Sequence, residues 1–325
     1  MQIGFLSGTG GDIQPITRDT NGYTTLTLSA DGKTLATVLA RSYATISILS
    51  EVNRKFGKPR PLLSQSNAFD ESSGLSWSAD GNLLVNDTGS LLKLGADGKS
   101  QTQLLADSSA VVIAPSLCSA NYLVLTWGFH GGTNWWNVWR TNTDGSSPLK
   151  LTDGKFDFGP VCSPDQKWVY YHDWTDNQIH RTPLDGSGKT EATQIHPIGR
   201  FSVSPDGKTL AAAVWGWQGA ELPEEAIKIA LFDLGSSSPP RMLHASHYSS
   251  GVQFTPDGKS IAYAIRESGV DNVWVQPLDG SPGHAITDFK SEQIWSFSLS
   301  QDGKNLAVLR GHWDSDVVLL QESKP

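Results

Sequence analysis

Tryptophan, histidine and charged side chains gather in two long insertions of the chain. The first is residues 127–136 (WGFHGGTNWW) and the second is residues 215–225 (WGWQGAELPEE). Aromatic faces stack on sugar rings and on apolar side chains, while charged groups fix a ligand's orientation. The two insertions therefore favour a binding surface for a protein, a glycan or another small molecule.

Shorter segments elsewhere carry the same residue types, at residues 172–176 (HDWTD), 266–267 (RE) and 310–314 (RGHWD). Arg200 and Trp295 stand just before or within other β-rich runs, where they could rim a central channel. A packing role, as expected for Trp168 and Trp274, is the alternative for each of these side chains. The candidate ligand-binding residues are Trp135, Trp136, Trp174, Trp217, Arg266, Arg310, His312, Trp313, Arg200 and Trp295.

No motif in the sequence supports a catalytic function. There is no Gly-x-Ser-x-Gly elbow, no assignable Ser, His and Asp order, and no kinase motif. We therefore predict no catalytic residues and no cofactor. The alternative is a carbohydrate-active lyase or hydrolase that holds a metal ion through histidines near a central channel. The histidines considered for that alternative are His130, His172, His247 and His312.

Two short acidic pairs were considered as calcium ligands. Asp173 with Asp176, and Asp314 with Asp316, lack the Asp-x-Asp-x-Asp-Gly order that makes calcium loops specific. Solvated turns are the better interpretation, and no metal site is predicted.

A repeat of about 45 residues must position these side chains. An apolar or thiol residue followed by Ser/Thr-x-Asp-Gly-Lys, or a variant of it, recurs seven times. Asp-Gly between two alternating runs is a strong hairpin signal, since glycine adopts positive φ without strain. The repeated residue is Leu28, Trp77, Cys118, Cys162, Val203, Phe254 and Leu299.

Each repeat contains four short β-rich runs, which is the pattern of a propeller blade. We predict an all-β fold: one seven-bladed β-propeller of four-stranded antiparallel blades, spanning residues 1–325 as a single domain. The N-terminal strand at residues 12–17 is expected to close the last blade. The expected blades lie near residues 23–65, 72–107, 109–153, 158–195, 198–245, 249–288, and 294–323 plus 12–17.

The ends of the chain leave one ambiguity. Residues 3–6 (IGFL) and residues 317–320 (VVLL) both match the third strand of the last blade. The surplus suggests either an extra edge strand or a chain that begins within a longer repeat array.

The sequence resembles the TolB-type, WD-like propellers at these repeats. Residues 254–264 (FTPDGKSIAYA) with 273–280 (VWVQPLDG) match that signature best, and Gln166 departs from it where glycine is expected. Residues 286–320 also resemble the C-terminal end of propellers attached to bacterial Ser/Thr kinases and transcriptional regulators. This resemblance implies a sensor-type interaction module within a larger signalling protein, periplasmic or extracellular if the kinase spans a membrane.

The composition and charge of the chain limit the classes of partner that it is expected to bind. The net charge of −8 and the absence of a basic run argue against nucleic acid. No apolar stretch is long enough to span a bilayer and no signal peptide is visible, so the compartment is not assigned. We expect a monomer that binds a protein or a small-molecule or glycan ligand on its loop face. Cys118 and Cys162 are interpreted as small buried hydrophobic residues rather than as a disulfide.

Overall fold

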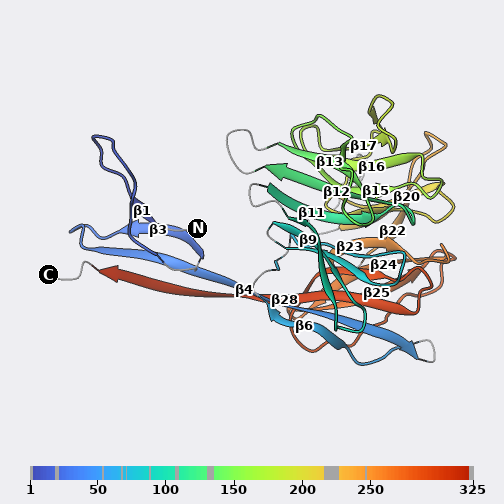
Figure 1. Ribbon diagram of the computed structural model, residues 1–325. Coiled ribbons are helices and arrows are strands. Elements are labelled where there is room, and N and C mark those ends of the chain that lie inside the picture. Colours follow the sequence, from blue (N-terminus) through green and yellow to red (C-terminus); the bar gives the residue numbers. More distant parts are fainter. Residues whose placement is uncertain are drawn as a thin grey trace.

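The chain is built from β-strands and turns (Figure 1). The computed structural model describes residues 3–18, 22–52, 55–66, 69–70, 72–87, 89–106, 110–129, 135–215, 227–245 and 247–321. Within these ranges no helix is long and apolar enough to cross a membrane. The predicted all-β propeller fold is confirmed.

Five consecutive four-stranded antiparallel sheets form blades one to five. Blade one comprises β7 (Leu75–Trp77), β8 (Leu83–Asn86), β9 (Ser90–Leu94) and β10 (Gln101–Ala106). Blade two comprises β11 (Ala110–Leu117), β12 (Tyr122–Phe129), β13 (Trp136–Asn142) and β14 (Leu149–Lys150). Blade three comprises β15 (Asp157–Cys162), β16 (Trp168–Asp173), β17 (Gln178–Pro183) and β18 (Glu191–Ala192).

Blade four comprises β19 (Phe201–Val203), β20 (Thr209–Trp215), β21 (Ile227–Asp233) and β22 (Arg241–His244). Blade five comprises β23 (Tyr248–Phe254), β24 (Ser260–Glu267), β25 (Val270–Pro277) and β26 (His284–Ala285). In every blade the first strand is innermost, and the chain moves outward one strand at a time.

Blade six combines the two ends of the chain. Its inner strands are β27 (Gln293–Leu299) and the first half of β28 (Asn305–Gln321), and its outer strands are the second half of β4 (Thr34–Val52) and β6 (Arg60–Ser66). A short strand, β5 (Lys55–Phe56), also pairs with the end of β4. Blade six therefore contains strands from both ends of the chain. It closes the ring, so that no gap is left between the first and the last blade.

The seam between blades six and one is apolar and hydrogen-bonded. Ile46 and Leu309 of blade six share one buried cluster with Trp77 and Leu83 of blade one. The Trp77 indole Nε1 donates to the carbonyl oxygen of Ser298 at 2.9 Å. Since β27 packs against β7, and each other innermost strand packs against the next, six blades surround one axis.

The repeated motif forms the same hydroxyl-to-aspartate turn in six of its seven copies, the exception being the copy at Ser119. At Ser204 the hydroxyl donates to the Asp206 carboxylate at 2.6 Å and accepts from the Thr209 amide at 2.9 Å. Asp206 also accepts from the Lys208 amide, and Gly207 adopts φ +73°. Hydrogen bonds to the carboxylate lower the pKa of Asp206, with the Ser204 hydroxyl as the main cause. Local hydrogen bonding therefore explains why the motif recurs.

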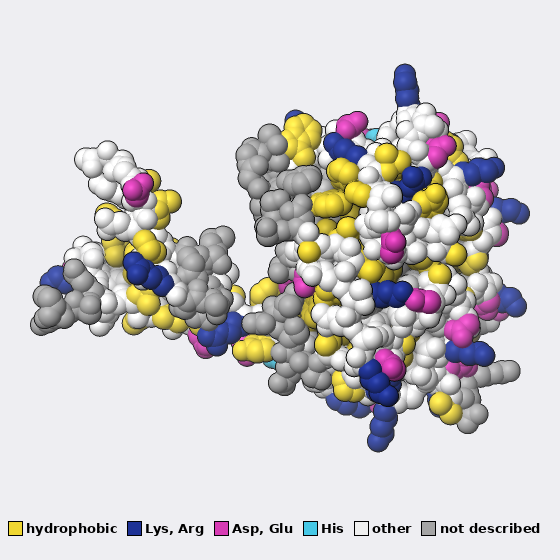
Figure 2. All heavy atoms as spheres, viewed as in Figure 1, with side chains coloured by type: hydrophobic (Ala, Val, Ile, Leu, Met, Phe, Trp, Pro, Cys, Tyr) yellow, Lys and Arg dark blue, Asp and Glu magenta, His cyan; other side chains and the backbone are white. Residues whose placement is uncertain are grey.

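Outside the ring, a β-sheet projects from blade six (Figure 1). We call it the arm: β1 (Gly4–Phe5), β2 (Gln14–Pro15), β3 (Gly22–Leu28), the first half of β4 and the second half of β28. A small core of Ile3, Tyr23 and Leu39 holds it together. Figure 2 shows the arm standing clear of the ring, with hydrophobic side chains on its surface.

The seven copies of the repeat are divided between the ring and the arm. The first copy of the repeat, at residues 26–33, forms the hairpin of β3 and β4 in the arm, so only six of the seven copies lie in the ring of the described residues. Residues 12–17 do not close the last blade, because β2 pairs with β1. Neither residues 3–6 nor 317–320 supply its third strand, which is the second half of β4.

The cysteine interpretation was also wrong. Cys118 and Cys162 form a disulfide, with their Cα atoms 5.2 Å apart, between blades two and three. The two cysteines occupy equivalent positions of neighbouring repeats. Cys118 directly follows the innermost strand of blade two, and Cys162 is the last residue of the innermost strand of blade three. That equivalence places the two side chains side by side, within the Cα separation that a disulfide needs.

Candidate functional site

A cavity of about 580 Å³ lies where the six innermost strands meet. Its walls come from every blade of the ring, and none of the described residues that line it is Asp or Glu. Trp174, from the turn between the second and third strands of blade three, also lines it. The cavity is therefore lined in part by one of the loops that the sequence singled out.

Bulges shape the walls of the cavity. The pairing register shifts near Ala114 in β11, near Gly159 in β15 and near Gly251 in β23. These three residues have φ of +51°, +62° and +67°. A bulge bends its strand and re-aims the neighbouring side chains, and bulges are common beside functional sites.

An aromatic row forms the wall at blades two and three. The rings of Trp136 and Phe158 lie 5.4 Å apart, and those of Phe158 and Trp174 lie 4.7 Å apart. Trp174 remains 59% exposed although it touches two rings, Phe158 and His172. An exposed tryptophan supported from behind presents a flat, rigid apolar face, which suits a planar or apolar ligand group.

Arg200 reaches across the ring from blade four. Its guanidinium lies 3.4 Å from the carbonyl oxygen of Ser73, just before blade one, which is the blade opposite in a ring of six. The surrounding protein lowers the pKa of Arg200 by desolvation, although its surface is open to the cavity. The guanidinium still stays charged, because its ordinary pKa lies far above neutrality.

Trp295 lines the cavity on blade six. Its ring lies 6.1 Å from that of Trp313, which is 46% exposed and does not itself line the cavity. The structure therefore places four sequence candidates, Trp136, Trp174, Arg200 and Trp295, around one space. Trp313 stands beside them, behind Trp295.

Arg266 and Arg310 lie outside the cavity and are held by carboxylates. Arg266 makes a bidentate ion pair with the buried Asp271: its Nε and Nη2 lie 2.6 and 3.0 Å from the two carboxylate oxygens. Arg310 lies 3.1 Å from Glu292 and over the ring of Phe289. Both arginines stabilise the edges of their blades.

His312 and Trp135 lie away from the cavity as well. His312 stacks on Tyr43, where β4 and β28 cross from blade six into the arm. Trp135 is 38% exposed, with the Lys155 ammonium 5.8 Å from its ring centre. Trp217 and the remainder of its insertion lie outside the described residues.

The histidines of the enzyme alternative do not form a metal site in the part of the chain that the structure describes. His172 lines the cavity and bonds to the Asn177 side chain at 2.9 Å, and burial lowers its pKa. His247 and His312 lie on other blades, and neither joins a ligand cluster. His130 lies outside the described residues.

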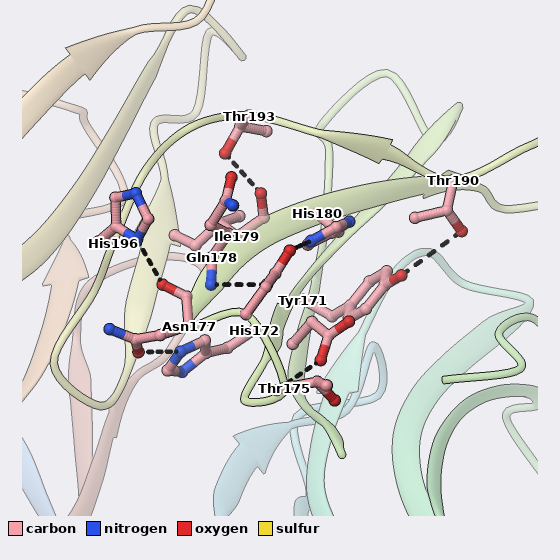
Figure 3. A network of polar contacts seen from close by, with 12 residues as sticks. Tyr171, His172, Thr175, Asn177, Gln178, Ile179, His180, Thr190, Thr193 and His196 are labelled. Carbon is pink, nitrogen blue, oxygen red and sulfur yellow. Dashed lines mark hydrogen bonds and ion pairs between the residues drawn. The ribbon is translucent and has the colours of Figure 1, made fainter. Parts of the chain in front are cut away.

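One group with metal-ligand geometry does exist, on the outer part of blade three. Ligand atoms of Asp173, Asp176 and His180 lie within 4.8 Å of one another. Figure 3 shows how this turn is already bonded: His180 contacts Asp176 at 2.9 Å, and the Thr175 and Gln178 amides donate to Asp173 and Asp176. These bonds agree with the interpretation of Asp173 and Asp176 as turn residues.

Phe158 is a cavity residue that the sequence reasoning missed. It lies in an innermost strand immediately before Gly159-Pro160. The signal was present, because glycine and proline inside a strand mark a bulge, and a bulge changes where the neighbouring side chain points.

Known structures share this fold. No protein-family model and no curated protein sequence matches the chain. A putative TolB from Agrobacterium tumefaciens superimposes with a TM-score of 0.66 and 20% identity, covering 83% of this chain and 99% of that one. An oligogalacturonate lyase in complex with manganese gives 0.55 and 13%, covering 89% and 96%.

A propeller from a nidogen/laminin complex also matches, with a TM-score of 0.55 and 14% identity over 74% of this chain and 91% of that one. These identities are low enough that the likeness concerns the fold and not the activity. The chain is therefore a β-propeller with the fold of the TolB-type proteins.

Proposed function

We propose that this chain is a non-catalytic interaction module that receives an apolar or aromatic group of a partner in its central cavity. The observation that carries the proposal is the row of Trp136, Phe158 and Trp174, which lines a cavity of about 580 Å³. A concave, largely apolar site with a few polar groups is typical of ligand binding. The partner is a protein, or a glycan or other small molecule.

Propellers of this fold occur in protein complexes, as the nidogen/laminin match illustrates. The likeness of residues 286–320 to propellers attached to bacterial kinases and regulators supports a sensor role within a larger signalling protein. The match to the lyase shows a similarity of fold alone. Within the described residues, His172, His247 and His312 do not come together in one group of metal ligands. Binding is thus better supported than catalysis.

The test is binding to peptide and glycan arrays by the wild-type protein and by Trp174→Ala. Trp174 is largely exposed, so its loss should spare the fold while removing stacking worth roughly 1 kcal/mol or more. Phe5→Ala is the control, because Phe5 is 57% exposed, lies in the arm and does not line the cavity. Equal binding by all three proteins would contradict the proposal.

A further inference from the structure

Arg200 is the one formally charged side chain among the described residues that line the cavity. His172 also lines it, but burial lowers the pKa of this histidine and keeps it neutral at neutral pH. Among the described residues no carboxylate lines the cavity, and a charged group in such an apolar space favours an anion there.

Three serine hydroxyls of the cavity are already bonded between blades. The Ser202 hydroxyl accepts from the Phe254 amide, and the Ser296 hydroxyl accepts from the Leu75 amide. The Ser250 hydroxyl donates to the carbonyl of Ile294. Arg200 has one long contact of 3.4 Å to Ser73, so most of its donors remain available to a ligand.

We propose that the cavity binds a carboxylate attached to an aromatic or apolar body, with Arg200 binding the carboxylate. This inference rests on the proposed function and names its ligand chemistry. The planar guanidinium fork matches a carboxylate's two oxygens, and the aromatic row of Trp136, Phe158 and Trp174 covers the apolar body.

Calorimetric titration with 2-naphthoate and with its neutral counterpart 2-naphthamide tests the proposal. The wild-type protein should bind the carboxylate at least roughly tenfold more tightly than the amide, which is the usual contribution of a charged hydrogen bond. Arg200→Gln should abolish that preference, so that the two probes bind with similar affinity. Arg241→Gln is the control, since Arg241 lies on an outer strand and bonds to Leu278.

The outcomes separate the two proposals. Equal binding of both probes by the wild-type protein overturns the carboxylate site and keeps the cavity as an apolar binding site. Binding of neither probe overturns both. A carboxylate preference that survives Arg200→Gln overturns the role of Arg200.

A separate observation concerns the arm. In blades three and five a short turn joins the second strand to the third, at residues 174–177 and 268–269. β4 and β28 have no such turn and run straight through residues 41–45 and 312–316. Residues 312–316 read His-Trp-Asp-Ser-Asp, and Asp and Ser favour turns over strands.

Because β4 and β28 continue without a turn, the first and the last repeat exchange strand partners. The second strand of the last repeat pairs with the third strand of the first repeat, and the reverse pairing forms the arm. Turns at residues 41–45 and 312–316 would return the four strands of the first repeat to one blade and the three strands of the last repeat to another. The arm exposes Leu26, Leu28, Val317 and Leu319, whose exposed fractions are 57%, 60%, 74% and 61%.

We infer that the arm is the opened form of a seventh blade, able to close into the ring by folding at these two segments. Closure would remove the open edges of the arm and cover apolar residues that now face water. It would also require the seam between blades six and one to part, so the two forms compete.

A disulfide between Val38→Cys and Val317→Cys tests this, because these residues are paired only in the arm. The matched control carries Val38→Ser and Val317→Ser. X-ray scattering of the control should give a radius of gyration near the ~20 Å of a compact chain of this length, and the crosslinked monomer a larger value. Equal and extended values overturn closure, and so does crosslinking between two molecules, which would indicate pairing of arms between copies.

Discussion

The ring and the arm are made from the same repeat, yet only the ring has a continuous core. In the ring, Ile46 and Leu83 are fully buried, and each blade covers its neighbour's face. In the arm, the sheet made of β3, β4 and β28 has a small core and open edges. A repeat unit of this kind cannot bury its own hydrophobic face, so its stability depends on its neighbours.

Because β4 and β28 belong to both regions, the comparison can be made within single strands. The halves of both strands inside blade six are mostly buried, whereas in the arm the β28 half is largely exposed and the β4 half is only half-buried. The same chain segment should therefore respond very differently to substitution on either side of residues 41–45.

The largest contrast is expected between Ile46→Ala and Val317→Ala. Ile46 is fully buried at the seam, so its truncation should cost about 2–5 kcal/mol of unfolding free energy. Val317 is 74% exposed, and its truncation should change that free energy by less than about 0.5 kcal/mol. Urea unfolding followed by circular dichroism measures both, and similar losses would show that the arm and the ring unfold as one body.

Reduction of the disulfide should come next in size. Cys118 and Cys162 join blades two and three, far from the arm, and close a loop of 44 residues. Removing such a crosslink typically costs about 2–4 kcal/mol. The Cys118→Ser and Cys162→Ser double variant should melt at a lower temperature than the oxidised protein and at the same temperature as the reduced protein. A double variant as stable as the oxidised protein would count against the crosslink.

The sequence predicted what depends on local chemistry. The Ser/Thr-x-Asp-Gly turn is set by hydrogen bonds within five residues, so all its copies could be read directly, and Gln166 keeps the turn at φ +60° in place of glycine. The innermost strands and the loop-face tryptophans followed from that period. Trp136, Trp174, Arg200 and Trp295 line one cavity because the repeat itself orders the strands, and their role in ligand binding stays a prediction.

What the sequence did not predict depends on contacts between distant segments. Residues 317–320 pair with β4, more than 250 residues away in the sequence, and not with residues 305–311. Similarly, the ion pairs of Arg266 with Asp271 and of Arg310 with Glu292 can be identified only once the strands are in place. Loop-closure entropy and tertiary packing, not propensity, determine such choices.

A smaller difference between the ring and the arm is expected when the glycine of the repeated turn is replaced. Gly207 in blade four and Gly32 in the arm have φ of +73° and +71°. Alanine is strained at either position, and Gly207→Ala should cost about 1 kcal/mol of unfolding free energy. Gly32→Ala should leave global unfolding unchanged and speed amide hydrogen exchange in the arm alone. Equal losses in both variants would mean that the arm adds to the stability of the ring.

The smallest effect should appear in acid. Hydrogen bonds lower the pKa of Asp206 in the ring and of Asp31 in the arm, with Ser204 and Ser29 as the leading donors. A carboxyl whose pKa is lowered by folding stabilises the native state above its ordinary pKa, and that contribution disappears as the pH falls through the lowered pKa.

Asp206→Asn should therefore be less stable than the wild-type protein at about pH 5, by at most roughly 1 kcal/mol because the carboxylate is exposed, and the difference should shrink toward pH 2. Asp31→Asn should show no difference in ring unfolding at either pH. Burial raises the pKa of Asp157, but this carboxyl is present in all three proteins and cancels from the comparison. If Asp31→Asn followed the pH dependence of Asp206→Asn, the arm would share the cooperative unfolding of the ring, as expected of a closed seventh blade.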